Sequence, residues 1–192
     1  MTTPWTDYEE VTGMLTEPVD EQRDHILGPD DAPVTLVEYG DYQCPYCVRA
    51  HPVVSALLQS NRPPIRYVFR HFPLTTVHPR AEPAAEAAEA AAAQDRFWPM
   101  HDLLFANSPQ LGDPDLLAFA RALDLDERRL VRDLVERVHA PKVRADFLSG
   151  VRSGVNGTPS FFINGHRHNG SFDLPTLQAA VEAAAHTGAR GR

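Results

Sequence analysis

One stretch of the chain, residues 34–47, constrains the fold more than any other. An apolar, β-branched run from Val34 to Tyr39 predicts a buried strand, and a short polar loop follows it. Cys44-Pro-Tyr-Cys47 then opens a segment with helical spacing, and these two cysteines are the only ones in the chain. Two cysteines cannot form a framework of structural disulfides, and a closed zinc site would need further ligands. Any sulfur chemistry is therefore expected at this point of the chain.

The spacing of the two cysteines indicates thiol–disulfide chemistry. A helix start favours an anion, so we expect a lowered pKa for Cys44. Pro45 suits the first helical position because it has no N–H to leave unsatisfied. Cys47 follows one turn later on the same face, from where it can attack a mixed disulfide on Cys44. We expect Cys44 to be the exposed, attacking sulfur and Cys47 to be the buried, resolving one.

A zinc site is the alternative interpretation of the cysteine pair. His51 lies one turn after Cys47, and another of the nine histidines would complete the ligands. The proline after Cys44 and the strand–helix–strand setting favour redox chemistry, so we expect no metal and no cofactor beyond a Cys44–Cys47 disulfide. We expect structural or solvated side chains at the remaining candidate histidines, which are His71, His78, His101, His166 and His168.

Two further positions are candidates for the same site. Glu38 is a charged residue in an otherwise apolar strand, six positions before Cys44. A buried carboxylate there would take the proton of Cys47, whereas the alternative is an acid that faces solvent at a strand edge. Pro159 begins an apolar run, where a cis Thr158–Pro159 bond would leave the backbone before it open to an extended substrate. Pro45, Tyr46, Thr158 and Pro159 are the predicted substrate-binding residues.

The rest of the pattern predicts one α/β domain that a helical block interrupts. Residues 25–188 form the domain, and residues 1–24 form an N-terminal extension. The extension contains either one short helix near Thr6–Leu15 or a poorly ordered tail. Some five helical segments fill residues 79–154 without a strand signal among them. The first of them is rich in alanine and places Glu82, Glu86 and Glu89 on one side. The strands and last helix are predicted at His25–Leu27, Val34–Tyr39, Ile65–Phe69, Thr158–Ile163, His166–Asn169 and residues 173–188, with a hairpin turn at Asn164-Gly165.

The charge balance limits the partners that such a chain would attract. Eighteen basic and twenty-six acidic residues leave a formal charge of −8, which disfavours nucleic acids and anionic membrane surfaces. The N-terminus has neither a basic segment nor an apolar core, and no later run has the length of a membrane span. We therefore expect a cytoplasmic protein without a nucleic-acid or membrane partner.

Taken together, these residues resemble the DsbA-like branch of the thioredoxin superfamily. The resemblance covers about residues 25–188 and depends on four blocks: Ala32–Cys47, Arg70–Leu74, Phe97–Phe105 and Gly157–Ile163. It implies a thioredoxin fold, with a mixed central sheet flanked by helices and an inserted all-helical subdomain. It also implies a thiol–disulfide oxidoreductase with Cys44 as nucleophile and Cys47 as resolving thiol, and it supports Glu38 as a buried acid.

The resemblance has two departures that affect function. The strongly oxidising periplasmic enzyme of the family has Pro-His between its cysteines, whereas this chain has Pro-Tyr, the pair familiar from glutaredoxins. We therefore expect a reduction potential of about −200 to −230 mV rather than about −120 mV. Secreted members also carry a leader, for which this chain shows no signal.

The expected partners are protein or peptide thiols and disulfides, together with a recycling redox partner that the sequence does not identify. Two other functions stay open at this stage. One is a glutathione-linked reductase, and the other is a non-catalytic module that binds clients in a groove of the helical block.

Overall fold

The computed structural model describes residues 13–189, which form an α/β fold around a five-stranded sheet. The strand order is β1-β3-β2-β4-β5, so β2 occupies the centre, as its apolar sequence predicts. The strands are β1 (His25–Leu27), β2 (Val34–Gly40), β3 (Ile65–His71), β4 (Ser160–Ile163) and β5 (His166–Arg167). The predicted fold class is confirmed.

The helices follow the predicted order closely. Five of them, α2 to α6, fill the predicted helical block of residues 79–154. The full set is α1 (Pro45–Ser60), α2 (Ala81–Ala92), α3 (Phe97–Asn107), α4 (Asp113–Ala122), α5 (Glu127–Val135), α6 (Ala140–Arg152) and α7 (Leu174–Ala189). The helix that we predicted near Thr6–Leu15 falls mostly outside the described residues. Among residues 13–189, no helix combines the length and apolar character needed to cross a bilayer.

The chain divides into two compact units. The first contains the chain up to Tyr39, residues 53–70 and the chain from Leu148 onward. The second contains residues 40–52 and 71–147. The second unit thus includes the helical block up to Phe147 and also the loop and first turns of α1 that carry both cysteines.

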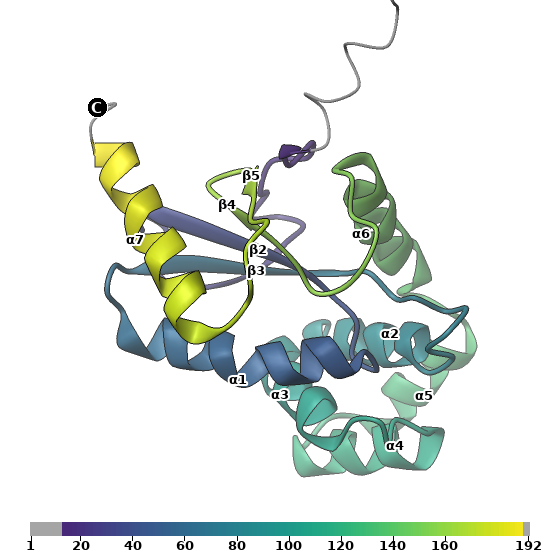
Figure 1. Ribbon diagram of the computed structural model, residues 1–192. Helices are drawn as coiled ribbons and strands as arrows, with labels where there is room; N and C mark the ends of the chain where they lie inside the picture. The colour runs from purple at the N-terminus through teal and green to yellow at the C-terminus, as the bar shows by residue number, and fades with distance from the viewer. Residues whose placement is uncertain (1–12, 190–192) are drawn as a thin grey trace, which may run out of the picture. The chain divides into compact units, whose positions relative to one another are not determined.

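The first unit contains nearly all of the sheet. β1 pairs antiparallel with β3, and β4 pairs antiparallel with both β2 and β5. Asn164 and Gly165 both have positive φ, 49° and 84°, which is the backbone of the predicted two-residue hairpin turn. α7 follows the hairpin and lies beside β4 (Figure 1).

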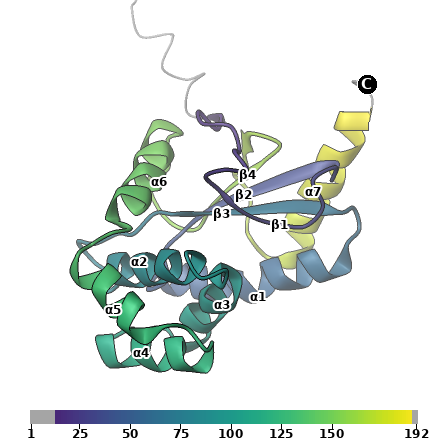
Figure 2. The same ribbon diagram turned by 180° about the vertical axis from the view of Figure 1, so that it is seen from behind.

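The second unit is built around α2. The α3, α4 and α5 helices pack with it (Figure 2), and its alanines are buried because their small side chains allow close approach. Two glutamates of the same helix, Glu86 and Glu89, are buried as well, although the acidic spacing of this segment suggested one polar side. Their partners come from distant parts of the chain, as described below.

Arg70 of β3 connects the N-terminal segment to the sheet in the first unit. The side chain is completely buried, and all five of its N–H groups have acceptors. Nε and Nη2 donate to the two carboxylate oxygens of Asp24 at 2.9 and 2.8 Å. The remaining donors reach the Glu17 and Pro18 carbonyls and the Tyr39 hydroxyl, each at 3.0 Å. Residues 17–24 are therefore attached to β2 and β3.

Candidate active site

The two cysteines lie at the start of α1, where the sequence predicts them. Helix α1 begins at Pro45, so Cys44 immediately precedes it and Cys47 belongs to its first turn. Both are buried, with exposed fractions of 3% for Cys44 and 0% for Cys47. The expectation of an exposed Cys44 is wrong, since the exposed residues of the motif are Pro45 and Tyr46.

Asp41 is a buried carboxylate that binds the backbone of the cysteine loop. Its Oδ1 accepts hydrogen bonds from the backbone N–H groups of Gln43 and Cys44, at 2.7 and 3.1 Å. Its Oδ2 accepts one from the N–H of Leu74 at 2.8 Å and lies 2.8 Å from Nδ1 of His78. This single buried carboxylate ties the cysteine loop to the segment that follows β3. The sequence signal was an aspartate three residues before the cysteine, which we did not interpret.

Aromatic and imidazole rings surround the loop inside the second unit. Tyr42 is buried, its hydroxyl lies 3.1 Å from Nδ1 of His101, and its ring packs at 4.8 Å from that of Phe105. His51, one turn after Cys47, stacks on Phe105 with 4.9 Å between ring centroids. His51 of α1 thus packs on Phe105 of α3, and Tyr42 contacts both His101 and Phe105 of α3. His101 is buried among these rings, and its structural role stays a prediction.

His51 groups with residues other than the cysteines. Its Nε2 lies 3.4 Å from a carboxylate oxygen of Asp102, and His101 offers a third potential ligand within 4.8 Å. Burial lowers the pKa of His51, and the Asp102 carboxylate opposes that shift. Burial also raises the pKa of Asp102, against the effect of His51. The zinc alternative had paired His51 with Cys44 and Cys47, which is not the grouping seen among the described residues.

A second buried group of charged and polar side chains lies around His71. Its Nε2 is 2.8 Å from Oε1 of Glu89, and its backbone N–H donates to Asp146 at 3.2 Å. Lys142 donates to the same Asp146 carboxylate at 2.6 Å. His71 and His78 both lie beside carboxylates, and their structural role stays a prediction.

Glu38 is buried in the first unit, with 2% of its surface exposed. It pairs with Phe161 across β2 and β4, and the Tyr67 hydroxyl of β3 donates to its Oε2 at 2.7 Å. The alternative of an acid that faces solvent at a strand edge is wrong. A buried carboxylate with a phenolic donor suits proton exchange, although the role in the reaction stays a prediction.

Pro159 immediately precedes β4, and the Thr158–Pro159 peptide bond is cis. Arg167 of β5 stabilises the loop that precedes Pro159. Its Nη1 donates to the Gly154 carbonyl at 2.6 Å, and its Nη2 donates to Oδ1 of Asn156 at 3.2 Å. We overlooked Arg167 in the sequence, where it stands between His166 and His168. A single basic residue on a short strand gives no separate signal.

The structure thus distributes the candidate residues over both units. Cys44, Pro45, Tyr46 and Cys47 share the start of α1 in the second unit. Glu38, Thr158 and Pro159 belong to the first unit. Tyr46 is 54% exposed, and the guanidinium carbon of Arg49 lies 4.7 Å from its ring centroid.

Comparison with known proteins identifies what this arrangement is similar to. A family model described as thioredoxin matches residues 20–183. A thioredoxin-like oxidoreductase from Silicibacter pomeroyi is 32% identical, with a TM-score of 0.74, over 86% of this chain and 94% of that one. BdbD from Bacillus subtilis, in its oxidised form, has a TM-score of 0.80 at 23% identity, over 92% of this chain and 98% of that one. The α-DsbA1 protein of Wolbachia pipientis has a TM-score of 0.77 at 22% identity, over 92% and 97%.

The curated relatives have a different name. A protein of Salinispora arenicola called Na⁺/H⁺ antiporter NhaA 1 is 52% identical over 170 residues, which are 88% of this chain and 26% of that protein. One of the same name from a Mycobacterium species is 44% identical over 186 residues, or 94% of this chain and 30% of that protein. The chain therefore spans less than a third of these relatives, and their name describes proteins much longer than the matched part.

Proposed function

This chain belongs to the thioredoxin family and has the fold of DsbA-type thiol–disulfide oxidoreductases, and from that premise we propose that it exchanges disulfides with protein or peptide substrates. The observation that carries the proposal is the pair Cys44 and Cys47, at the start and in the first turn of one helix. The proposal does not include the transport activity that the name of the antiporter relatives describes.

The proposed exchange has two steps. The Cys44 thiolate attacks one sulfur of a substrate disulfide, so that a mixed disulfide forms and one substrate thiolate leaves and takes a proton. Cys47, after losing its proton, attacks the Sγ of Cys44 and releases the second substrate thiol. Two electrons pass from the Cys44–Cys47 dithiol to the substrate. The reverse sequence oxidises a substrate dithiol, and a second thiol or disulfide must restore the starting state.

Several features support this division of roles. The start of α1 presents backbone N–H groups and a positive dipole end, which favour a thiolate at Cys44 over one at Cys47. The cysteines are nearly covered while Pro45 and Tyr46 are exposed, so a substrate would make its first contact with the proline and tyrosine. Access to the Cys44 sulfur then requires a small displacement of its surroundings.

The proposal gives roles to two residues of the first unit, Glu38 and Pro159. Glu38 would accept the proton of Cys47, a role for which its burial and its hydrogen bond from Tyr67 are suitable. The backbone at Thr158 and Pro159 would pair with an extended substrate chain. The recycling partner and the cytoplasmic location stay predictions.

Arg167 favours a second candidate, a glutathione-linked activity. Glutathione carries two carboxylates, and Arg167 places a guanidinium beside the loop that ends at Pro159. Both of its Nη atoms already donate to that loop, so we rank this function second. Initial rates with glutathione disulfide and with a protein disulfide, measured under the same conditions, separate the two.

Cysteine variants test the leading proposal. We expect Cys44→Ser to reduce insulin disulfides no faster than the uncatalysed reaction, because the nucleophile is gone. Cys47→Ser should instead accumulate mixed disulfides on Cys44, visible as adducts that dithiothreitol removes in non-reducing electrophoresis and mass spectrometry. The Cys44→Ser/Cys47→Ser double variant is the control for adducts unrelated to exchange. Full activity of Cys44→Ser would overturn the proposal.

A further inference from the structure

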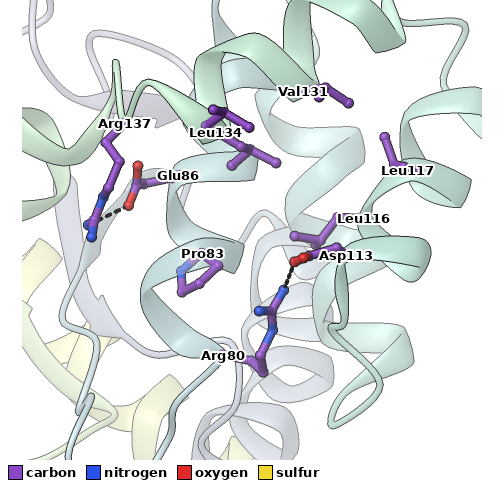
Figure 3. Close-up of a pocket in the computed structure, with 10 residues that line it drawn as sticks. Arg80, Pro83, Glu86, Asp113, Leu116, Leu117, Val131, Leu134 and Arg137 are labelled. Atoms are coloured by element: carbon purple, nitrogen blue, oxygen red, sulfur yellow. Dashed lines mark hydrogen bonds and ion pairs between the residues drawn. The ribbon is translucent and has the colours of Figure 1, made fainter.

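A pocket of about 320 Å³ lies in the second unit, between α2, α4 and α5. Its volume is at the lower end of the range for small-molecule sites, about 300–1,000 Å³. Apolar side chains form most of its wall: Pro83 of α2, Leu116 and Leu117 of α4, and Leu134, Val131 and Val135 of α5 (Figure 3). Val131 and Val135 are 41% and 77% exposed, which is unusual for valine and leaves an apolar edge open to solvent.

Glu86 is the polar group of this pocket that lacks full hydrogen bonding. The residue is 3% exposed, and Arg137 binds its Oε1 at 2.7 Å. Its Oε2 is buried and has no hydrogen-bond partner. A buried carboxylate oxygen without a donor is costly, and in a native structure it indicates a missing partner.

The charges around Glu86 indicate the sign of that partner. Arg137 also binds Glu82, one turn earlier on α2, so one guanidinium serves two carboxylates (Figure 3 shows the Glu86 contact). Arg80 and Asp113 form a separate ion pair at another part of the lining. Within the lining, the guanidiniums of Arg80 and Arg137 balance the carboxylates of Asp113 and Glu86. Around Arg137 alone, two carboxylates share one guanidinium, because Glu82 binds the same side chain from outside the lining.

We propose that the pocket between α2, α4 and α5 binds a small organic ammonium ion. Its N–H groups donate to Oε2 of Glu86, and its hydrocarbon part lies against Leu116, Val131 and Leu134. Neutral alcohols offer one hydrogen bond without charge, and carboxylates meet repulsion from Glu86, so both bind less well. The site is separate from the cysteine loop and does not depend on thiol exchange.

Binding of three six-carbon probes tests the proposal. Hexylammonium, hexanol and hexanoate have the same apolar chain and differ in charge, and methyl resonances of Val131 and Leu134 report binding in an NMR titration of the full chain. We expect hexylammonium to bind in the millimolar range, hexanol about tenfold more weakly, and hexanoate more weakly again. Equal binding of all three probes, or no response to hexylammonium at these methyl groups, would overturn the proposal.

Two variants test whether Glu86 binds the ammonium group. Glu86→Gln keeps the shape of the side chain and should weaken hexylammonium binding about tenfold, while hexanol binding changes less than threefold. Glu82→Gln removes the other carboxylate of Arg137, which lies outside the pocket lining, and should change hexylammonium binding less than about threefold. Unchanged affinity in Glu86→Gln contradicts the proposal.

Val131→Trp provides a second, independent test, because it fills the open edge of the pocket and leaves Glu86 intact. Thermal unfolding of each variant shows that it is folded before binding is measured. A folded Val131→Trp protein should lose hexylammonium binding. If it binds the probe like the wild type, the ammonium ion does not occupy this pocket.

Discussion

Asp24 and Glu86 are both buried carboxylates that face an arginine, and their surroundings differ. Both oxygens of Asp24 accept from Arg70, and every N–H of that arginine is used. Glu86 shares Arg137 with Glu82, and one of its oxygens has no partner. Arg70 is completely buried, whereas half of the Arg137 side chain is exposed.

The difference separates a structural ion pair from a site that can take a ligand. Although burial opposes it, the hydrogen bonds and charge of Arg70 hold the pKa of Asp24 below its ordinary value. Burial raises the pKa of Glu86, and Arg137 only partly opposes that shift. A fully paired buried carboxylate stabilises the fold only with its partner in place, whereas a half-paired one can still be satisfied from outside.

The comparison predicts its largest effect for Arg70→Met. The variant removes the arginine that pairs with a buried aspartate, and with it five hydrogen bonds. We expect a loss of about 3–5 kcal/mol in the free energy of unfolding, measured by urea denaturation at neutral pH. Arg66→Met is the matched control on β3, because Arg66 pairs with the exposed Glu21, and it should cost less than about 1 kcal/mol. An equal loss of unfolding free energy in the two variants would show that the buried Arg70–Asp24 pair is no more important for stability than the exposed Arg66–Glu21 pair.

The sequence predicted the order of elements because periodicity and turn residues are local signals. The helical spacing in residues 79–154 led to five expected segments, and the structure has five helices there. Asn164-Gly165 located the hairpin for a similar reason, since its positive φ angles follow from two residues alone. The position of Cys44 before α1 and of Cys47 in its first turn also followed from local spacing.

The contacts of buried polar groups were not predictable in the same way. The Glu82, Glu86 and Glu89 spacing gave a helix with a polar side, but the helix buries two of the three. Their partners, Arg137 and His71, come from other elements of the chain, so no local pattern predicts these pairs. The burial of Cys44 was missed as well, because its position before a helix is a local signal that does not show what covers the side chain.

The acid dependence of stability provides a second, smaller test of the Asp24 pair. Because the folded-state pKa of Asp24 is lowered, its contribution is fully present above the unfolded value of about 3.9. It is lost as the pH falls through the lower folded value. Unfolding midpoints of the wild type should therefore fall more steeply than those of Asp24→Asn below about pH 4. Parallel curves for the two proteins would mean that the charge of Asp24 does not contribute to stability through its pair with Arg70.

Glu86→Gln should have the smallest effect, with the opposite pH dependence. The raised pKa of Glu86 means that its contribution is fully present below the unfolded value of about 4.3 and is lost as the pH rises through the folded value. The charges of Arg137, Glu82 and His139 also affect the pKa of Glu86, and so the pH at which this contribution is lost. The stability of the variant relative to wild type should therefore increase from about pH 4 to pH 7.

At neutral pH the two consequences of Glu86→Gln oppose each other. The variant removes a charge that is buried with one unpaired oxygen, and it also weakens the contact with the exposed guanidinium of Arg137. We expect the free energy of unfolding to change by less than about 1 kcal/mol, against the several lost in Arg70→Met. Glu82→Gln is the control with the same arginine. A loss in Glu86→Gln as large as that in Arg70→Met would show that Glu86 is a structural ion pair like Asp24, and that Arg137 alone satisfies it.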